Sequence, residues 1–323
     1  MGDDDSGHGQ HAEKPREIPS RGWLDIAKRV KNQLADDHVQ IVAAGVAFYF
    51  FFALFPAITA VISVYGLLVD PSQAEAQIDG MSAMLPEQAH GMIGDIAHNI
   101  ASSSNQTLGW GMALAILLSL WSANKGTTAL FEGLNIAYDE ADRRNFFRKN
   151  MITLVCTLLG IITGIIMMAL IAGFPALVVG RLGLPEIART LINYLRWPLM
   201  ALIVIIFLGV LYKIAPDREG PEWRWVTWGS VIATMLWLAG SFLFSWYVDN
   251  FGKFGNTYGS FAAIIILMLW FWLTAFIVLL GAEINSEMEH QTGVDTTTGP
   301  DEPMGQRGAY HADHVAGEPH EGS

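Results

Sequence analysis

The amino-acid sequence predicts an all-α, polytopic membrane protein in which six transmembrane helices form one bundle, with amphipathic helices at its surface. Hydrophobic residues make up 52% of the 323 residues, charged residues only 15%, and the mean hydropathy is +0.34. Soluble domains carry about 25% charged residues, so this composition argues against a soluble domain. The charges between residues 39 and 280 also gather in short clusters that separate long apolar stretches.

Six segments predict the membrane spans, because a helix needs about 20 apolar residues to cross a bilayer. The six lie near residues 41–69, 108–123, 151–179, 197–212, 226–248 and 260–280. The second and fourth are short, and we expect them to extend into polar flanks. Together the spans form a membrane domain over residues 21–289. The acidic arm at 1–20 and the polar tail at 290–323 are predicted to be disordered, because neither has enough apolar surface to bury.

The distribution of Lys and Arg predicts that both termini lie in the cytoplasm. In this orientation 15 of the 19 basic residues lie on the inner side and 4 on the outer side. The first external loop, residues 70–107, carries no basic residue and has apolar stripes at helical spacing. It is expected to form an acidic cap on the outer face.

Residues 23–35 predict an amphipathic helix before the first span. Trp23, Ile26, Val30 and Leu34 recur at helical spacing, and basic residues lie between them. Two readings stay open. The helix rests on anionic lipid at the cytoplasmic surface, or it packs on the inner mouth of the bundle.

Pro56 lies in the middle of the first span. A proline frees the carbonyl four residues earlier and kinks a helix, so we expect a bend that turns the segment from Tyr49 to Pro56 toward the bundle interior. Broken helices form binding sites in transporters, whereas many proline kinks serve packing alone. Both readings stay open.

The end of the second span carries a lysine, Lys125, directly after an apolar run. Glu132 lies two helical turns further on the same face, so the two residues could pair in a cytoplasmic vestibule. Alternatively, Lys125 extends to interfacial water. The sharpest hypothesis is that Lys125 lies in a wet, inward-facing cavity and contacts an anionic substrate group. The candidate cavity residues are Tyr49, Pro56, Ser122, Asn124, Lys125, Glu132 and Asn135.

Three further polar residues are candidates for structural roles: Arg224, Glu283 and Asn285. Glu283 and Asn285 follow the last span and are expected to mark its cytoplasmic end. The alternative is a buried ion pair of Glu283 with Lys125 or Arg224. Gly160 and Gly164 form a G-x-x-x-G pattern that permits close helix approach.

Several classes of function are excluded by the sequence. The apolar interiors of the six spans hold no Asp, Glu, Lys or Arg, which proton pumps and voltage sensors need. There is no phosphate-binding loop and no HExxH or GxSxG motif, so no catalytic residue, metal site or cofactor is predicted. The net charge of −12 argues against nucleic acid as a partner. The single cysteine, Cys156, excludes an intramolecular disulfide.

Ten short blocks make the chain resemble the YihY/BrkB family of bacterial inner-membrane proteins. They are AAGVAFY (43–49), ALFP (53–56), LWSANKG (120–126), LNIAY (134–138), RWP (196–198), YKIAPDR (212–218), WRWVT (223–227), FSWYVDNFG (244–252), TYGS (257–260) and LGAEIN (280–285). The resemblance implies a multi-pass bundle in the bacterial inner (plasma) membrane, linked to envelope integrity, serum resistance and lipid handling. Some members carry the name ribonuclease BN, but this sequence offers neither a metal cluster nor a basic RNA groove, which makes ribonuclease activity an unfavourable reading.

Two functions follow as hypotheses. The first is a transporter-like protein for a lipid or another amphipathic, anionic solute, without its own ATPase. The second is a non-transporting membrane scaffold that supports envelope integrity. The expected partners are membrane lipids and, for the scaffold, envelope proteins. No motif specifies an oligomeric state.

Overall fold

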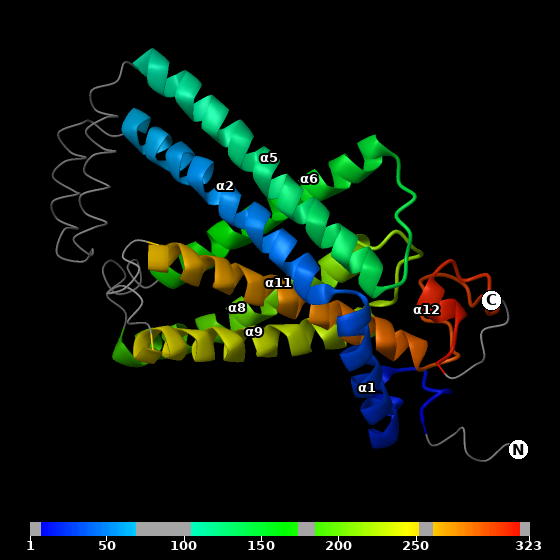
Figure 1. Ribbon diagram of the computed structural model, residues 1–323. Helices are drawn as coiled ribbons and strands as arrows, with labels where there is room; N and C mark the ends of the chain where they lie inside the picture. Colours follow the sequence, from blue (N-terminus) through cyan, green and yellow to red (C-terminus); the bar gives the residue numbers. More distant parts are fainter. Residues whose placement is uncertain (1–7, 69–104, 174–184, 252–260, 317–323) are drawn as a thin grey trace, which may run out of the picture. The chain divides into compact units, whose positions relative to one another are not determined.

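The computed structural model describes residues 8–68, 105–173, 185–251 and 261–316 (Figure 1). Across these ranges the regular secondary structure is helical, and one isolated β-bridge joins Pro221 to Thr297. The long helices are α1 (Ser20–Asp36), α2 (Val39–Leu68), α5 (Asn105–Ala137), α6 (Phe146–Met168), α8 (Glu186–Ile214), α9 (Trp223–Phe251) and α11 (Phe261–His290). Three short elements complete the fold: a 3₁₀ turn η2 (Pro15–Glu17), a π-helical turn η4 (Ala169–Gly173) and α12 (Tyr310–Asp313).

Within the described ranges, five helices are long and apolar enough to cross a membrane: α2, α6 with its π-helical continuation, α8, α9 and α11. The prediction of an all-α protein with several membrane-spanning helices is therefore confirmed. The second predicted span, residues 108–123, lies within the helix α5, which is not one of these five. Polar residues at both ends of α5 dilute its apolar stretch, which is short.

Three helices extend well beyond the predicted spans. Helix α5 continues to Ala137, fourteen residues past the predicted end at 123. Helix α8 begins at Glu186, eleven residues before the predicted start at 197, and so includes Arg196 and Pro198. Helix α11 continues to His290, ten residues past the predicted end at 280. A boundary drawn at the first polar residue fails here, because the polar residues at the end of α11 are buried by other parts of the protein.

The chain forms two compact units. We call residues 48–126 the pair unit and the remainder, residues 1–47 with 127–323, the core unit. Within the core unit α11 packs against α9, α1 and α12, α9 packs against α8, and α8 packs against α6. Buried residues of α1, α9 and α11 meet in a small apolar cluster that also takes in residues before α1: Ala12, Ile18, Ile26, Val30, Trp225 and Met288.

Helices α9 and α11 approach closely through glycines. A Cβ atom added to Gly229 would lie 2.3 Å from the carbonyl oxygen of Gly281, and one added to Gly281 would lie 2.3 Å from the hydroxyl of Tyr212. Either methyl group would clash, so glycine is required at both positions. By contrast, an added Cβ at Gly164 meets nothing within 4 Å, so the G-x-x-x-G pattern at 160–164 marks no such contact here.

Residues 8–20 of the arm and 291–316 of the tail, two segments predicted to be disordered, are among the described residues and are joined by hydrogen bonds. Arg307, only 6% exposed, donates hydrogen bonds to the carbonyl oxygens of Gly293, Glu302 and Ala312. Thr292 joins the tail to the arm by donating to the carbonyl of Ala12 at 2.7 Å. In Figure 1 the tail with α12 lies beside the end of α11. Side-chain bonds to backbone carbonyls order these polar segments, and composition alone does not detect such bonds.

Helix α1 belongs to the core unit and packs against α11. Gly22, Ile26 and Val30 are buried, and Ile26 and Val30 join the apolar cluster with residues of α9 and α11. Lys28 and Lys31 lie on the exposed side. This arrangement fits the second of the two open readings for this segment, and it leaves a basic outer face.

Candidate functional site

The last three turns of α11 carry a run of buried polar side chains. Glu283, Asn285, Ser286, Glu287 and Glu289 are each no more than 2% exposed. These residues do not all lie on one face of the helix, because only residues three or four positions apart share a face. Burial of so many polar groups is costly unless they find partners, so this end of α11 is the natural place to look for a site.

Glu289 forms a buried, bidentate ion pair with Arg218, which lies in the loop between α8 and α9. Both guanidinium-to-carboxylate distances are 2.8 Å, and the two side chains are 0% and 1% exposed. Thr296 donates a further hydrogen bond to Glu289 at 3.0 Å. The guanidinium also lies 4.2 Å from the ring centre of Tyr138. Burial opposes the charge on Arg218, but Glu289 beside it outweighs burial and raises the pKa of the guanidinium.

A second ion pair joins α1 to α11. Arg29 pairs with the carboxylate of Glu287 and donates to the side-chain oxygen of Gln291 at 2.7 Å. Arg29 is one of the basic residues that lie between the apolar positions of this helix, and one of the two open interpretations placed them against anionic lipid. The structure turns it inward instead, because the buried carboxylate of Glu287 requires a cation.

Two of the predicted polar residues are asparagines that join backbone segments. Asn285 accepts a hydrogen bond from the backbone N–H of Gly229 at 2.8 Å and donates to the carbonyl of Val226 at 3.3 Å. Asn135 accepts from the backbone N–H of Asp217 at 2.8 Å. Both side chains are buried, so each satisfies backbone groups where helices meet loops or one another.

Glu283 has neither of the ion-pair partners considered from the sequence. Arg224 pairs with Glu222, and none of the ion pairs among the described residues includes Lys125. Glu283 is 0% exposed, and neither of its carboxylate oxygens accepts a hydrogen bond. The Asp37 carboxyl lies within hydrogen-bonding reach of it. Glu283 is therefore a buried acid that faces another acid.

His311, Ser286 and Asp139 lie together but do not form a catalytic triad. Asp139 and the Ser286 hydroxyl both approach the same ring nitrogen of His311, Nε2, at 2.9 and 3.5 Å, while Nδ1 has no partner. A relay from carboxylate to hydroxyl needs one group on each nitrogen. Burial lowers the pKa of His311, although Asp139 opposes this effect. In the described ranges no group of three His, Cys, Asp or Glu side chains could hold a metal ion.

The pair unit contains five of the seven candidate cavity residues. Ser122 is 1% exposed and its hydroxyl donates to the carbonyl of Tyr49 at 3.3 Å, whereas the Tyr49 side chain is 37% exposed. Pro56 lies inside α2, which continues through it from Val39 to Leu68. Asn124 and Lys125 are half-buried. Within the described part of this unit, Lys125 is the sole charged side chain.

The other two candidate cavity residues, Glu132 and Asn135, belong to the core unit. Glu132 pairs with Lys149 at 3.2 Å, and Lys149 also contacts Asp142 at 3.2 Å. Asn135 binds the backbone of Asp217, as described above. Both residues thus have partners within their own unit, and the shared cavity that the sequence suggested stays a prediction.

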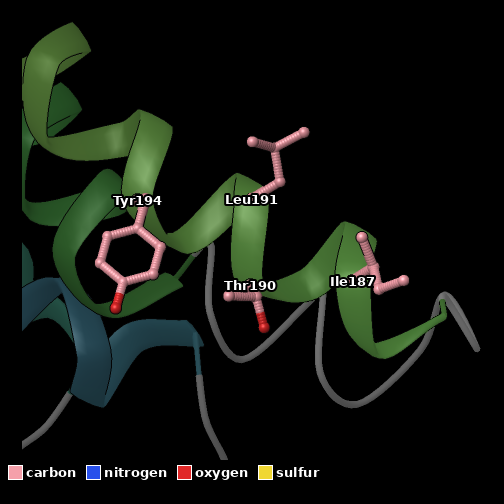
Figure 2. Close-up of a pocket in the computed structure, with 4 residues that line it drawn as sticks. All are labelled: Ile187, Thr190, Leu191 and Tyr194. Atoms are coloured by element: carbon pink, nitrogen blue, oxygen red, sulfur yellow. The ribbon is translucent and has the colours of Figure 1, made fainter.

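A shallow hollow of about 460 Å³ lies along the first turns of α8 (Figure 2). Its lining comes from a single helical stripe: Ile187, Thr190, Leu191 and Tyr194. Three of these side chains are between 65% and 84% exposed. An open, mostly apolar stripe on a membrane-spanning helix is the surface expected to face lipid, so the hollow does not form an enclosed binding site.

Sequence reasoning missed several residues that build the polar end of α11: Arg29, Arg218, Asp37, Glu287, Glu289 and His311. The signal available for Arg218 is its place in the YKIAPDR block. The other residues come from α1, the end of α11 and the tail, and their proximity depends on the fold.

A sequence profile of the family described as "Virulence factor BrkB" matches residues 30–305. A ribonuclease-like protein of Bacillus subtilis, YfkH, is 31% identical over 252 residues, which is 76% of this chain and 89% of that protein. A UPF0761 membrane protein of Tolumonas auensis is 24% identical over 270 residues, 78% of this chain and 81% of its own length. One from Vibrio cholerae is 35% identical over 100 residues, 30% of this chain and 33% of that protein. No solved structure matches the chain.

Proposed function

Because the chain belongs to the BrkB family of integral membrane proteins, we propose that it moves an anionic, amphipathic solute of lipid type across the membrane without an ATPase of its own. The supporting observation is Lys125. It is half-buried in α5, takes part in none of the described ion pairs, and is the one charge in the described part of the pair unit. A half-buried cation that no ion pair of the described residues engages favours an anionic group such as a phosphate or a carboxylate.

The neighbours of Lys125 in sequence fit this role. Ser122 fixes one turn of α5 to the carbonyl of Tyr49 in α2, so the helix that carries Lys125 is held by a polar contact close to it. The aromatic side chains of Phe48, Phe52 and Phe55 on α2 are more than half exposed. Such a surface suits acyl chains, and the lysine suits a headgroup.

The proposal places the protein in the bacterial inner membrane with both termini in the cytoplasm. It counts α5 as a sixth span, so the first external loop, residues 70–107, lies outside. The charge asymmetry of 15 inner to 4 outer basic residues supports this orientation. Reporter fusions at Gly80 and Ser323 test it. An active cytoplasmic reporter at Ser323 and an inactive one at Gly80 are expected, and a cytoplasmic Gly80 would contradict it.

Variants of Lys125 test the role in transport. Lys125→Gln is expected to abolish complementation of an envelope phenotype in a deletion strain while membrane abundance stays normal. Lys125→Arg keeps the charge and is expected to retain partial function, since a guanidinium differs from an ammonium in geometry. Lys149→Gln is the matched control, because Lys149 is engaged with Glu132 and Asp142. Full complementation by Lys125→Gln would contradict the proposal.

A second candidate function is a membrane scaffold for envelope proteins. The observation that favours it is the cytoplasmic end of the core unit, where buried ion pairs fix the arm, the tail and α11 to one another. Such a rigid polar surface suits the docking of another protein better than it suits the conformational change that transport requires. Lys125→Gln separates the two functions, because a scaffold would tolerate it.

The ribonuclease-like name of the Bacillus subtilis relative does not lead us to propose nuclease activity. Metal-dependent phosphodiester cleavage needs clustered metal ligands, and the part of the chain that the structure describes has no such group. The single histidine beside a serine and a carboxylate, His311, has the wrong geometry for a relay.

A further inference from the structure

Glu283 combines complete burial with a lack of hydrogen-bond donors. It lies about 10 Å before the end of α11, at 1.5 Å per residue, and its side chain is 0% exposed. Among the described carboxylates it is the one with both oxygens buried and unpartnered. A buried carboxylate in this condition costs several kcal/mol, so the ionised form is strongly disfavoured.

The Asp37 carboxyl faces Glu283 from the turn between α1 and α2. The turn is fixed locally, because the N–H of Asp37 donates to the carbonyl of Gln33 at 2.8 Å and His38 adopts a φ of +52°. One oxygen of Asp37 is also buried without a partner. Burial raises the pKa of Asp37 to about 6, although its contact with Glu283 opposes that rise.

The other charged groups around this pair do not neutralise it. Asp36, Asp139 and Glu287 add negative charge. The hydroxyl of Tyr138 is fully buried and is a neighbour of both Asn285 and Glu283. The nearby basic side chains already have carboxylate partners: Arg29 and His290 contact Glu287, Arg218 contacts Glu289, and His311 contacts Asp139.

We propose that Asp37 and Glu283 form a proton-binding site in which the two carboxyl groups share one proton, and that this proton joins the end of α11 to the turn between α1 and α2. A shared proton supplies the donor that the buried oxygens lack. It also removes the repulsion of two adjacent negative charges. The ligand is a hydrogen ion, and the site is independent of the proposed transport function.

Loss of the proton has a defined structural consequence. With both groups ionised, like charges repel across the contact and one of them stays buried without a partner. The turn between α1 and α2 is then expected to separate from α11, while Arg29 and Glu287 keep α1 attached. Because the folded state holds the proton more tightly than the unfolded state, the contribution of the pair to stability is full below about pH 4, where an unfolded carboxyl is also protonated. It is lost as the pH rises from there through the raised pKa of Asp37, about 6.

Infrared difference spectroscopy of the purified full-length protein in lipid nanodiscs tests the shared proton. The wild type is expected to show the carbonyl stretch of a protonated carboxyl at neutral pH. Glu283→Gln and the double variant Asp37→Asn/Glu283→Gln are expected to lose this band, and Asp37→Asn to keep it at a shifted frequency. Glu287→Gln, which alters a carboxylate already paired with Arg29, is the matched control and should keep the band unchanged.

A second measurement covers the structural consequence. Glu283→Gln mimics the protonated carboxyl, so its unfolding temperature is expected to vary less with pH than that of the wild type above about pH 4. Three results would overturn the proposal: no protonated carboxyl in the wild type at neutral pH, a band that survives in the double variant, or equal pH dependence of unfolding in wild type and Glu283→Gln.

Discussion

Removal of the negative charge of Glu289 is expected to destabilise the core unit more than any substitution at an exposed ion pair. Glu289→Gln keeps the side-chain volume but leaves the Arg218 guanidinium buried at 1% exposure without its counter-charge. It also weakens the hydrogen bond from Thr296. Breaking a buried pair by removing one partner costs about 3–5 kcal/mol. That loss lowers the ratio of folded to unfolded protein by roughly two to three and a half orders of magnitude.

Equilibrium unfolding in mixed detergent micelles, followed by tryptophan fluorescence, measures this loss. Trp225, 0% exposed in the apolar cluster of the core unit, provides a signal for the packed state. Glu222→Gln is the control, because Glu222 and Arg224 are each 37% exposed and such a pair contributes about 1 kcal/mol or less. Equal free energies of unfolding for Glu289→Gln and Glu222→Gln would show that the buried pair of Glu289 and Arg218 does not stabilise the end of α11.

Three further predictions concern packing, the tail and pH. Gly229→Ala is expected to destabilise the protein by about 1–3 kcal/mol in the same unfolding assay, since its Cβ would lie 2.3 Å from a backbone oxygen. The control Gly164→Ala should be neutral, because an added Cβ there has no described atom within 4 Å. Equal effects of the two substitutions would contradict the close approach of α9 and α11. Arg307→Ala should expose the tail to limited proteolysis by removing its bonds to three carbonyls, and an unchanged cleavage pattern would count against that role. Burial lowers the pKa of His311, so the unfolded state binds more protons at acid pH and the contact of α12 should weaken as the pH falls below about 6.5. Proteolysis of the tail across this range should depend on pH in the wild type and not in His311→Asn.

The helical class and the positions of the long helices were within reach of the sequence. Long apolar stretches need internally bonded backbones in a membrane, so a helix over 41–69 or 226–248 follows from length and hydropathy alone. The ends of the helices were not predictable in this way. The polar residues after Leu280 in α11 read as a flank exposed to water, but Arg29 and Arg218 supply the charges that allow helix and burial to continue to His290.

The candidate site shows the same division. Asn135, Asn285 and Glu283 were singled out because polar groups beside apolar helices need an explanation, and all three are buried. Their partners come from residues 37, 217 and 229, which lie from 56 to 246 positions away. No spacing rule connects such distant positions. The hydrogen bonds of the tail were out of reach for a related reason, because Arg307 donates to carbonyl oxygens in three separate parts of it.

Transport of an anionic lipid-like solute is the central claim, and reconstituted liposomes test it most directly. The measurement is the rate at which a fluorescent anionic phospholipid crosses the bilayer of vesicles that contain the protein at known density, compared with a zwitterionic phospholipid and with empty vesicles. Faster movement of the anionic probe is expected with the wild type, together with a loss of that acceleration in Lys125→Gln and wild-type movement with the control Lys149→Gln. Equal rates for vesicles with and without the wild-type protein, or full activity of Lys125→Gln, would contradict the claim.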